Sequence, residues 1–464
     1  MHSEPMPSVK VFYCYAREDK LLRDELEKYL GNLRRQNHIT SWSDYEINGG
    51  KEWTEEIDLK LNAADIILIL ISPSFMHLEY YYEAEMKRAM QRLNTKDSYV
   101  IDIILHPINW EDALISKLQI LPDGEKPITI RLNRDEAFYD IARGIGKVIN
   151  ETLKEQWLKE SRNFRITNKF EEALTAIEKA ISLDPKYIQA YVEKGIIYRD
   201  RPFELTDADI SDFDFGSKRV SDEVIALFEK AIQLDPTYAQ AYFEIAVTYA
   251  RNAYYTEALI TIEKVIQLDP TYAQAYLEKG IIYRKKPCKP FEWTDDYIGD
   301  YDETIALANF NEAIASFEKV IQLDPTYAQA YYEMATTYYN KKEYQKALVS
   351  IDKFIELGPS NSTTYLRRGL CLNKLERLVE AIGAYEIAIQ LDPDNADAYV
   401  AIGDTFYALE RLEEALQNYK KFVQLNPYQN LVYRKMGKIY ETFAKRAYYD
   451  ADNRGVSWLY DEFY

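Results

Sequence analysis

A 34-residue repeat constrains the fold of this chain more than any other feature of its sequence. The segment AIQLDPTYAQAYFE, which begins at Ala231, returns as VIQLDPTYAQAYLE from Val265 and as VIQLDPTYAQAYYE from Val320. Four of the six gaps between successive marker prolines are 34 residues long, the prolines being Pro185, Pro236, Pro270, Pro325, Pro359, Pro393 and Pro427. A period of this length predicts stacked helix pairs, each of which buries its apolar face against its neighbours.

The unit that begins at Ala239 carries the detailed pattern of the repeat. Its apolar or small residues lie at Tyr242, Ile245, Ala246, Tyr249, Ala258, Ile262 and Val265, and it closes at Pro270. This pattern resembles the tetratricopeptide repeat (TPR). The resemblance implies an all-α solenoid of seven repeats over residues 151–427, of which the first keeps the family tryptophan as Trp157. Residues 428–464 then form a capping helix and an aromatic tail.

Two of the gaps are longer, and both additions fall between the paired helices, near residues 200–217 and 285–308. They are acidic and aromatic, and they follow the same motif, EKGIIYR. Growth of a surface loop explains them, and so does a shared docking role. The resemblance to TPR arrays implies a protein or peptide ligand on the array.

Composition narrows the classes of partner. The chain has 464 residues and a formal net charge of −19. Binding to nucleic acid without sequence preference needs a basic surface, whereas this chain is acidic. No apolar segment is long enough to cross a membrane, and no signal sequence opens the chain. With three cysteines and four histidines that never cluster, neither a disulfide framework nor a metal site is supported. We therefore expect a cytoplasmic protein that binds neither nucleic acid nor membrane.

Residues 1–150 follow a different pattern, in which apolar strands alternate with helices. The expected strands begin at Val9 (VKVFYCYA), Asp65 (DIILILIS), Tyr99 (YVIDIILH) and Lys126 (KPITIR). The expected helices cover 20–35, 54–62, 80–93 and 135–150. Near-continuous apolar strands between helices predict an α/β domain with a parallel sheet covered on both faces. Ligands of that class bind at the carboxyl ends of the strands.

Three motifs narrow the family of this α/β domain. VFYCYAREDK resembles the first strand of a TIR domain, SDYEINGGKEW resembles its BB loop, and AADIILILISPSFMHLEYYYEAEMKRAM resembles its central strand and the helix after it. The resemblance is to bacterial TIR domains and implies a flavodoxin-like sheet. One position departs from the family, because Tyr81 stands where a cysteine is common.

The TIR resemblance also implies an activity, the cleavage of NAD+ between nicotinamide and ribose. One carboxylate near the ribose suffices to stabilise the positive charge that develops there. The motif match assigns this role to Glu85. Glu83 is suited to a surface pair with Lys87, and Glu79 to the positive end of a helix dipole. A surface glutamate paired with Arg88 is the structural alternative for Glu85.

The same resemblance implies an NAD+ cleft around that carboxylate. Its residues are Tyr15, Ala16, Arg17, Trp42, Ser43, Asp44 and Tyr81. An aromatic ring there stacks on a flat base, and an arginine binds phosphate. Ordinary structural roles are also open, since a tryptophan packs in cores and an aspartate begins turns. NAD+ is then the substrate, and neither a resident cofactor nor a metal is expected.

Two classes of function stay open at this point. The first is a regulated NAD+ hydrolase or cyclase of bacterial antiphage immunity, in which TIR domains self-associate and the TPR array senses a trigger or directs assembly. The second is a non-catalytic adaptor in which both parts bind proteins. The presence of Glu85 favours the enzyme, whereas Tyr81 in place of cysteine leaves room for the adaptor.

Overall fold

A computed structural model describes most of the chain. It covers residues 7–36, 38–43, 59–77, 91–92, 98–108, 119–121, 126–202, 213–286, 303–358 and 361–453, with side chains described throughout except at 42, 43, 119, 120, 213–221, 303 and 450–453. Contacts group the chain into two compact units, Met1–Ala241 and Tyr242–Tyr464. The first unit holds a sheet and the first helices of the array, and the second holds the remaining helices.

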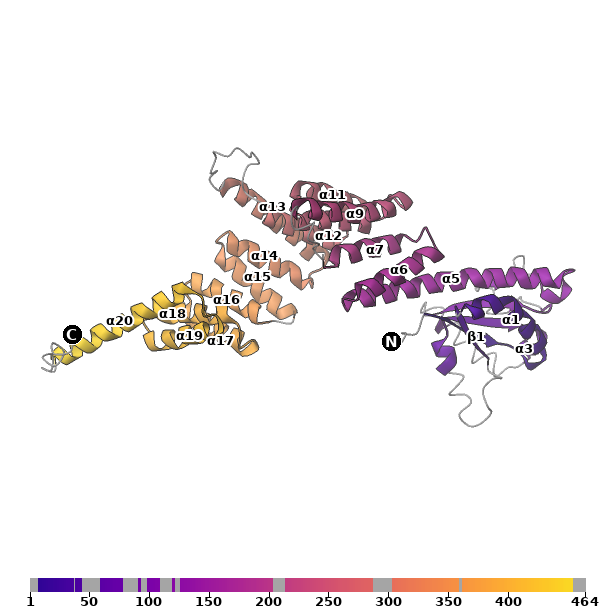
Figure 1. The fold of residues 1–464 in the computed structure, drawn as a ribbon, viewed down its shortest axis with the longest axis horizontal. Coiled ribbons are helices and arrows are strands. Elements are labelled where there is room, and N and C mark those ends of the chain that lie inside the picture. Colours follow the sequence, from indigo (N-terminus) through magenta and orange to yellow (C-terminus); the bar gives the residue numbers. More distant parts are fainter. Residues whose placement is uncertain are drawn as a thin grey trace, which may run out of the picture. The chain divides into compact units, whose positions relative to one another are not determined.

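The sheet has five parallel strands in the order β2-β1-β3-β4-β5 (Figure 1). The strands are β1 (Val9–Cys14), β2 (Ile39–Ser43), β3 (Ile66–Ile71), β4 (Tyr99–Ile104) and β5 (Gln119–Leu121). All six residues of β3, IILILI, are buried. Such continuous burial requires cover on both faces, as parallel sheets have. The α/β prediction and its flavodoxin-like strand order are therefore confirmed.

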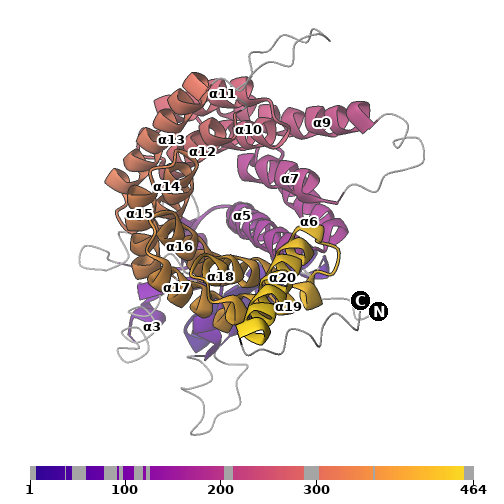
Figure 2. The ribbon, with the colours of Figure 1, turned by 90° about the vertical axis from the view of Figure 1, so that its left-hand side faces the viewer.

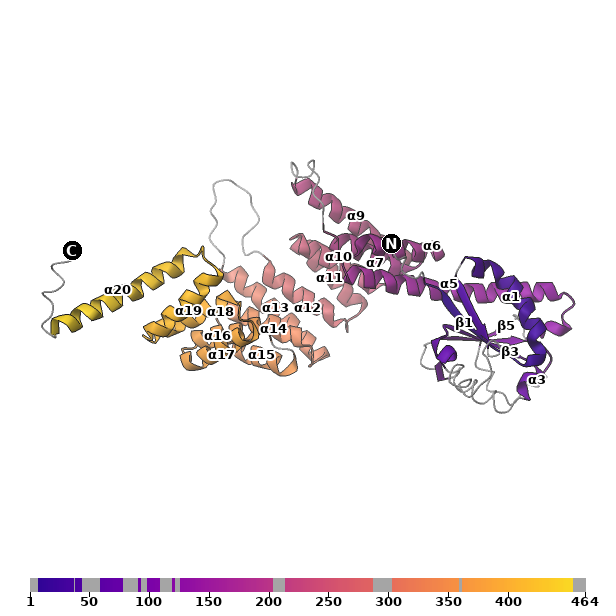
Figure 3. The ribbon, with the colours of Figure 1, turned by 60° about the horizontal axis from the view of Figure 1, so that its bottom comes forward.

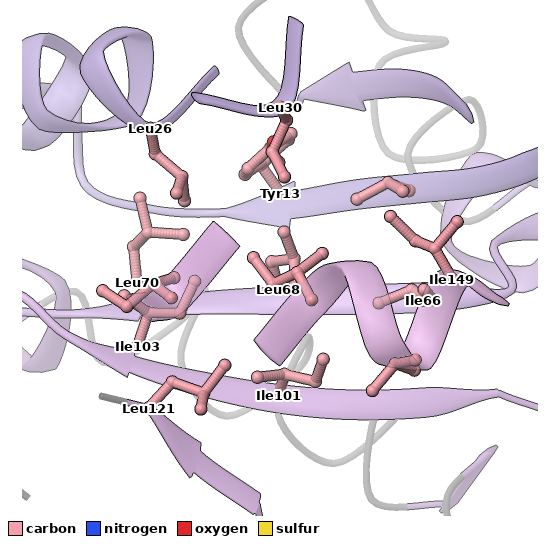
Figure 4. Packing of buried hydrophobic residues seen from close by; sticks show 14 of the residues in the cluster. Tyr13, Leu26, Leu30, Ile66, Leu68, Leu70, Ile101, Ile103, Leu121 and Ile149 are labelled. Carbon is pink, nitrogen blue, oxygen red and sulfur yellow. The ribbon is translucent and has the colours of Figure 1, made fainter. Parts of the chain in front are cut away.

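Two helices cover one face of this sheet, α1 (Lys20–Arg35) and α5 (Arg134–Ile166). Helix α1 has the predicted bounds, because its apolar residues recur at helical spacing toward the sheet. Figure 4 shows Leu26 and Leu30 of α1 and Ile149 of α5 packed with Leu68, Leu70, Ile101 and Ile103 of the strands. The strands β1 and β3 and the two helices are visible together in Figure 3. The face opposite this core carries Phe12, Ile69 and Asp102, all of them buried.

The strand predicted at KPITIR is wrong. Residues Ile128–Ile130 form a 3-10 turn, η4, instead. Its Thr129 donates both its backbone N–H and its hydroxyl to the carbonyl of Leu105, at 3.1 and 2.9 Å. The carbonyl of Leu105 thus accepts both hydrogen bonds of Thr129. A strand at this position would instead have formed a ladder of backbone hydrogen bonds with a neighbouring strand. The last two described strands along the chain are β4 and the short β5. The sequence pattern predicted neither β2 nor β5.

Two predicted helices fall largely outside the described residues. Of the helix expected over 54–62, residues 59–62 are described and are helical, and the helix continues to residue 63. Of the helix expected over 80–93, residues 91 and 92 are described and are helical. A single turn of helix, α3 (Pro73–Met76), follows β3, and Ser72 caps it by accepting a hydrogen bond from the N–H of Phe75.

Helix α5 does not end at residue 150. It runs for 33 residues, from the sheet into the first helix pair of the array, where it packs on α6 (Phe170–Leu183). Trp157 contacts both the sheet core and the core of this first pair, and Leu183 of α6 also packs against the sheet core. No proline interrupts the segment. The junction between the two parts is therefore a continuous helix.

The array continues as pairs of antiparallel helices. In chain order the helices are α7 (Ile188–Asp200), α9 (Phe213–Leu234), α10 (Ala239–Arg251), α11 (Tyr255–Leu268), α12 (Ala273–Lys285), α13 (Glu303–Leu323), α14 (Ala328–Asn340), α15 (Tyr344–Leu357), α16 (Ser362–Lys374), α17 (Leu378–Leu391), α18 (Ala396–Ala408), α19 (Leu412–Leu425) and α20 (Asn430–Asn453). Within the second unit, successive helices lie side by side (Figure 2). In the part of the chain that the structure describes, α20 has no second helix after it.

The repeated Asp-Pro and tyrosine residues have a local structural role. Each Asp-Pro step ends a second helix, because proline cannot continue it, and Asp235, Asp269 and Asp324 each accept a hydrogen bond from the N–H two residues on. The tyrosine six residues after the proline then donates its hydroxyl to the proline carbonyl, as Tyr276 does to Pro270 at 3.3 Å. This turn accounts for part of the 40 tyrosines in the chain.

Glycines let the paired helices approach closely. A Cβ at Gly369 would lie 2.4 Å from the ring of Tyr385, and one at Gly403 would lie 2.7 Å from the ring of Tyr419. Gly195 and Gly280 meet phenylalanine rings in the same way. An aromatic side chain of the second helix thus occupies the space that a larger residue of the first helix would fill.

The two insertions partly lengthen helices. Helices α9 and α13, which follow them, have 22 and 21 residues, whereas α11 and α15 have 14. Residues 203–212 and 287–302 lie outside the described residues. Part of each insertion therefore lengthens the second helix of its pair at its N-terminal end.

Candidate active site at the carboxyl edge of the sheet

The strand order marks one edge of the sheet as the place where a ligand site is expected. Chain order reverses between β1 and β3, since the connection after β1 leads to β2 on one side and the later strands lie on the other. In open parallel sheets, ligands bind outside the carboxyl ends of the strands at such a reversal. The segments after β1 and β3, Tyr15–Arg17 and Ser72, are therefore the first to consider.

Two of the three residues predicted after β1 are buried. Tyr15 and Ala16 are 2% and 0% exposed, whereas Arg17 is exposed and begins the 3-10 turn η1 (Arg17–Asp19). The hydroxyl of Tyr15 accepts a hydrogen bond from Arg23 of α1 at 3.1 Å, and the guanidinium carbon lies 5.2 Å from the centre of the ring. The ring of Tyr15 thus belongs to the sheet core, and Arg17 is the side chain that this loop presents to solvent.

A buried carboxylate joins the ends of β1 and β3. The hydroxyl of Ser72 donates to Oδ2 of Asp19 at 2.5 Å, and Asp19 is 4% exposed. Burial raises the pKa of Asp19, while the hydrogen bond from Ser72 and the charge of His106 oppose that rise. Ser72 is therefore fixed from two sides, as a donor to Asp19 and as the acceptor of the Phe75 N–H at 3.1 Å.

His106, after β4, completes the cluster. Its Nε2 lies 3.8 Å from Oδ1 of Asp19, and its Nδ1 lies 3.3 Å from the hydroxyl of Thr129. Because that hydroxyl already donates its proton to Leu105, the imidazole must be the donor in its contact with Thr129. Nδ1 then carries a proton, and Nε2 faces the carboxylate. The side chain of His106 is 39% exposed, so the cluster reaches the surface there.

The other predicted site residues are described in part or not at all. Trp42 and Ser43 end β2, and their backbones pair with Phe12 and Tyr13 of β1, so both lie at the carboxyl end of the strand next to β1. Their side chains are not among those described. Asp44, Tyr81 and Glu85 lie outside the described residues, as do Glu79 and Glu83.

Two family comparisons match the two parts of the chain. Residues 11–139 match the TIR domain family. Tetratricopeptide repeat families match residues 157–187, 227–259, 302–342, 328–361, 369–410 and 396–429. The chain is a TIR–TPR protein. The carboxyl-edge cluster belongs to its TIR domain, and the helix pairs from α5 and α6 onward belong to its TPR array.

A curated relative of this TIR–TPR protein is "Uncharacterized protein y4lF" of Sinorhizobium fredii (strain NBRC 101917 / NGR234). The two are 42% identical over 140 residues, which is 30% of this chain and 43% of the relative. The chain thus spans less than half the length of that protein, whose name states no activity.

Several solved structures resemble the TPR array. YrrB, described as a TPR protein with an unusual peptide-binding site, is 23% identical, with 45% of this chain and 96% of that chain covered and a TM-score of 0.37. MamA is 24% identical, with 39% and 95% covered and a TM-score of 0.33. PilF of Pseudomonas aeruginosa is 15% identical, with 54% and 96% covered and a TM-score of 0.39. Similarity at this level identifies no ligand of the TIR–TPR protein.

Sequence reasoning missed three residues of the TIR cluster, Asp19, Ser72 and His106. Each stands within a few residues of a strand end, and this position is the signal that could have found them. The sequence does not show that Asp19 and Ser72, which are 53 residues apart, form a hydrogen bond.

Other classes of site find no support in the part of the TIR–TPR protein that the structure describes. No group of three or more His, Cys, Asp or Glu side chains there is placed to hold a metal ion. None of the described helices has the length and apolar character needed to cross a membrane.

Proposed function

We propose that the TIR domain cleaves NAD+ at the bond between nicotinamide and ribose, with Glu85 as the catalytic carboxylate. The observation that carries the proposal is the reversal of strand order between β1 and β3, which marks the carboxyl ends of these strands as the ligand edge of the sheet. There the fold brings the Tyr15–Arg17 loop to the same edge as the end of β2, and the TIR resemblance assigns both segments to one substrate site.

The chemistry suits a site with one acting carboxylate. Nicotinamide leaves as a neutral molecule from a cationic substrate, and positive charge develops on the ribose. A carboxylate at that position binds the ribose hydroxyls and stabilises the charge. Water then adds to the ribose carbon and loses a proton, which gives ADP-ribose, nicotinamide and one proton. If the adenine ring adds instead, the product is a cyclic isomer.

The described residues supply the frame of this site. Arg17 is exposed just after the end of β1, and in this proposal it is the cation that meets the diphosphate. The hydrogen bond between Ser72 and Asp19 fixes the start of the segment that leads from β3 toward Glu85. Trp42, Ser43 and Asp44, at and after the end of β2, and Tyr81 border the base and the ribose. In this scheme the backbone of Ala16 lets the substrate approach the end of β1.

We propose further that the TPR array controls this activity. TIR domains complete their site by association, so the array acts as the sensor or the assembly platform, with bacterial antiphage immunity as the setting. The continuous helix α5 supports control through orientation, because it carries residues of the TIR core and of the first TPR pair.

Release of nicotinamide tests the enzyme proposal. Full-length protein, concentrated or cross-linked so that TIR domains associate, is incubated with NAD+. We expect Glu85→Gln to lower the rate by at least about a hundredfold, because an electrostatic group that acts in the transition state contributes on that scale. Glu83→Gln, two residues away, is the matched control and should keep the wild-type rate.

The adaptor is the alternative that this experiment separates. If wild-type protein releases no nicotinamide in any assembled state, the enzyme proposal fails and the adaptor stands. If Glu85→Gln and Glu83→Gln both retain activity, NAD+ cleavage stands and the assignment of Glu85 fails.

A further inference from the structure

The helix pairs of the array follow a rule of size at one contact. Four first helices carry a glycine there, and a Cβ added to any of them would come closer than 3.0 Å to an aromatic ring of the second helix: Gly195 to Phe228, Gly280 to Phe317, Gly369 to Tyr385 and Gly403 to Tyr419. Where the first helix carries a larger residue, the residue 16 positions later on the second helix is a buried isoleucine: Ile177 after Ser161, Ile262 after Ala246 and Ile351 after Ala335. A glycine at this position therefore indicates an aromatic partner.

Helix α20 carries this glycine without a ring. Gly437 stands 34 residues after Gly403, and no described atom lies within 4 Å of a Cβ added to it. The four glycines that meet rings are buried, whereas Gly437 is exposed. Tyr440 is 48% exposed, but Phe406, its counterpart on α18, is only 6% exposed. The surface that receives a second helix in the other pairs is thus present on α20 and uncovered by the described residues.

This surface runs along one side of α20. Four residues at helical spacing form it, and we call them the end face: Tyr433, Gly437, Tyr440 and Ala444. A neighbouring side of the helix, with Val432 and Ile439, belongs to the core shared with α19. Figure 3 shows α20 after α19 at the end of the second unit. Packing on α19 therefore leaves the end face open.

The end face is complementary to a second copy of itself. An antiparallel pair of α20 helices that sets Tyr440 opposite Gly437 of the other copy repeats this contact by two-fold symmetry. The same register sets Tyr433 opposite Ala444 of the other copy, so each ring lies opposite a small residue. The helices of each described pair, such as α18 and α19, are also antiparallel and also set a ring against a glycine.

Charges beside the end face agree with this register. Arg434 comes within about two residues, or ~3 Å along the axis, of Glu441 of the other copy. Glu441 binds Lys445 at 2.9 Å within its own helix, with its side chain 64% exposed. Such an exposed pair is weak in water, so Glu441 can also bind an arginine of a second chain.

We propose that two copies of this chain associate through the end face, each α20 serving as the missing second helix of the other. The occupant is selected by its shape, because the end face carries both the rings and the small residues that receive them. This association does not depend on NAD+ cleavage, and it gives the array a contact of its own for assembly.

Sedimentation equilibrium of the full-length protein measures the association. In a single chain the Cβ of Gly437→Ala meets no described atom and favours the helix, but in the pair it meets the ring of Tyr440. Gly437→Ala and Tyr440→Ala should each raise the Kd at least tenfold, which corresponds to about 1.4 kcal/mol. Tyr449, 71% exposed on another side of α20, is the control, and Tyr449→Ala should change the Kd less than twofold. All three changes leave the TIR domain untouched.

A cross-link tests the register. Arg434→Cys and Glu441→Cys are made separately in protein that carries Cys288→Ser, and the other native cysteines, Cys14 and Cys371, are buried. In the proposed pair, residue 434 lies near residue 441 of the other copy but about nine residues, or roughly 13 Å along the axis, from the other residue 434. Oxidation should therefore give at least fivefold more covalent dimer in the mixture of the two variants than in Arg434→Cys alone.

Three outcomes would overturn the inference. The first is wild-type protein that stays monomeric at every concentration, or that associates no more tightly than Gly437→Ala and Tyr440→Ala. The second is equal cross-linking in the mixture and in Arg434→Cys alone. The third concerns residues 454–464, which include aromatic residues. If only a variant that ends at residue 453 dimerises, that segment occupies the end face in the full chain.

Discussion

Asp102 is a carboxyl group in a place where ionisation is costly. It lies in the middle of β4, is 0% exposed, and pairs on the sheet with Ile69 and Ile120. Neither of its oxygens has a hydrogen-bond partner in the described part of the chain. Burial raises the pKa of Asp102 from its ordinary value of 3.8 to about 7. Its state of ionisation must therefore couple to the stability of the sheet.

The sign and size of the coupling follow from that shift. Between pH 3.8 and 7 the unfolded chain loses this proton while the folded chain keeps it, so stability falls as pH rises through this range and levels off above it. About three pKa units at 1.36 kcal/mol each give a total of about 4 kcal/mol. Asp102→Asn keeps the shape and removes the ionisation. Its advantage over wild type should grow by roughly 2–3 kcal/mol between pH 5 and pH 8.

Hydrogen exchange of the β3 and β4 amides in the full-length protein measures this difference. Rates at pH 5 and pH 8, corrected for intrinsic exchange, give the free energy of opening for both proteins. Asp24→Asn, at a carboxylate 44% exposed on α1, removes one charge from the same domain and is the control. If the advantage of Asp102→Asn is the same at both pH values, Asp102 is not protonated in the fold and the reasoning fails.

Two further predictions concern the stability of the array. Gly403→Ala should lower the thermal midpoint of the array, at a cost of about 1–3 kcal/mol, because the added Cβ would meet the ring of Tyr419 at 2.7 Å. Gly437, 34 residues on, is the matched control, since a Cβ added there would have no described atom within 4 Å. Gly437→Ala should therefore stabilise α20 by up to about 1 kcal/mol. Asp184→Asn removes the carboxylate that binds Lys154 at 2.8 Å and should cost about 1–2 kcal/mol at pH 7 by urea unfolding. Because Lys154 lowers the pKa of Asp184, the wild-type advantage should be present above the ordinary carboxyl pKa and should vanish as pH falls through the lowered value. Equal midpoints for the two glycine variants, or a loss at Asp184 that persists in acid, would contradict these arguments.

Periodicity predicted the elements that bury a continuous apolar face. Helix α1 has the expected bounds, and β1, β3 and β4 lie within the expected strands, since burial and sequence pattern express the same constraint there. Strand β2, ITSWS, is mostly polar and, among the described strands, pairs with β1 alone, so its sequence reads as a loop. The opposite error occurred at KPITIR, where β-branched residues favour a strand but contacts with Leu105 stabilise a turn. Neither case can be decided without tertiary contacts.

The candidate site was predictable in position more than in contacts. The TIR resemblance selected Tyr15–Arg17, in keeping with the rule that ligands gather at strand ends, and the structure places this segment at the reversal of strand order. The rule does not say which side chains face outward, and Tyr15 is in the core while Arg17 is exposed. The hydrogen bond between Asp19 and Ser72 could not be predicted from the sequence, because these residues follow β1 and β3, which become neighbours only in the folded sheet.

Helix α5 joins the two parts of the protein without a gap in packing. Ile145, Ile149 and Leu153 lie in the sheet core, and Leu158 lies in the core of the first TPR pair. Leu153 and Leu158 are five residues apart, which is roughly 7.5 Å along a helix. Trp157 contacts both cores. A rotation or shift of the first TPR pair must therefore move the sheet with it.

This continuity gives a test of how the array controls the TIR domain. A Gly-Ser segment of about ten residues inserted after Asn150 interrupts α5 between the two cores, and nicotinamide release should then become either constitutive or absent whatever the trigger. An insertion of roughly seven helix-forming residues at the same place is the control, because two helical turns change the distance by about 10 Å but nearly preserve the orientation of the faces. If orientation carries the signal, the helical insertion keeps more of the response than the flexible one. If both insertions keep the wild-type basal activity and response, α5 transmits nothing. Control would then have to come from partners that bind the array, and the end face of α20 would be the first place to look for them.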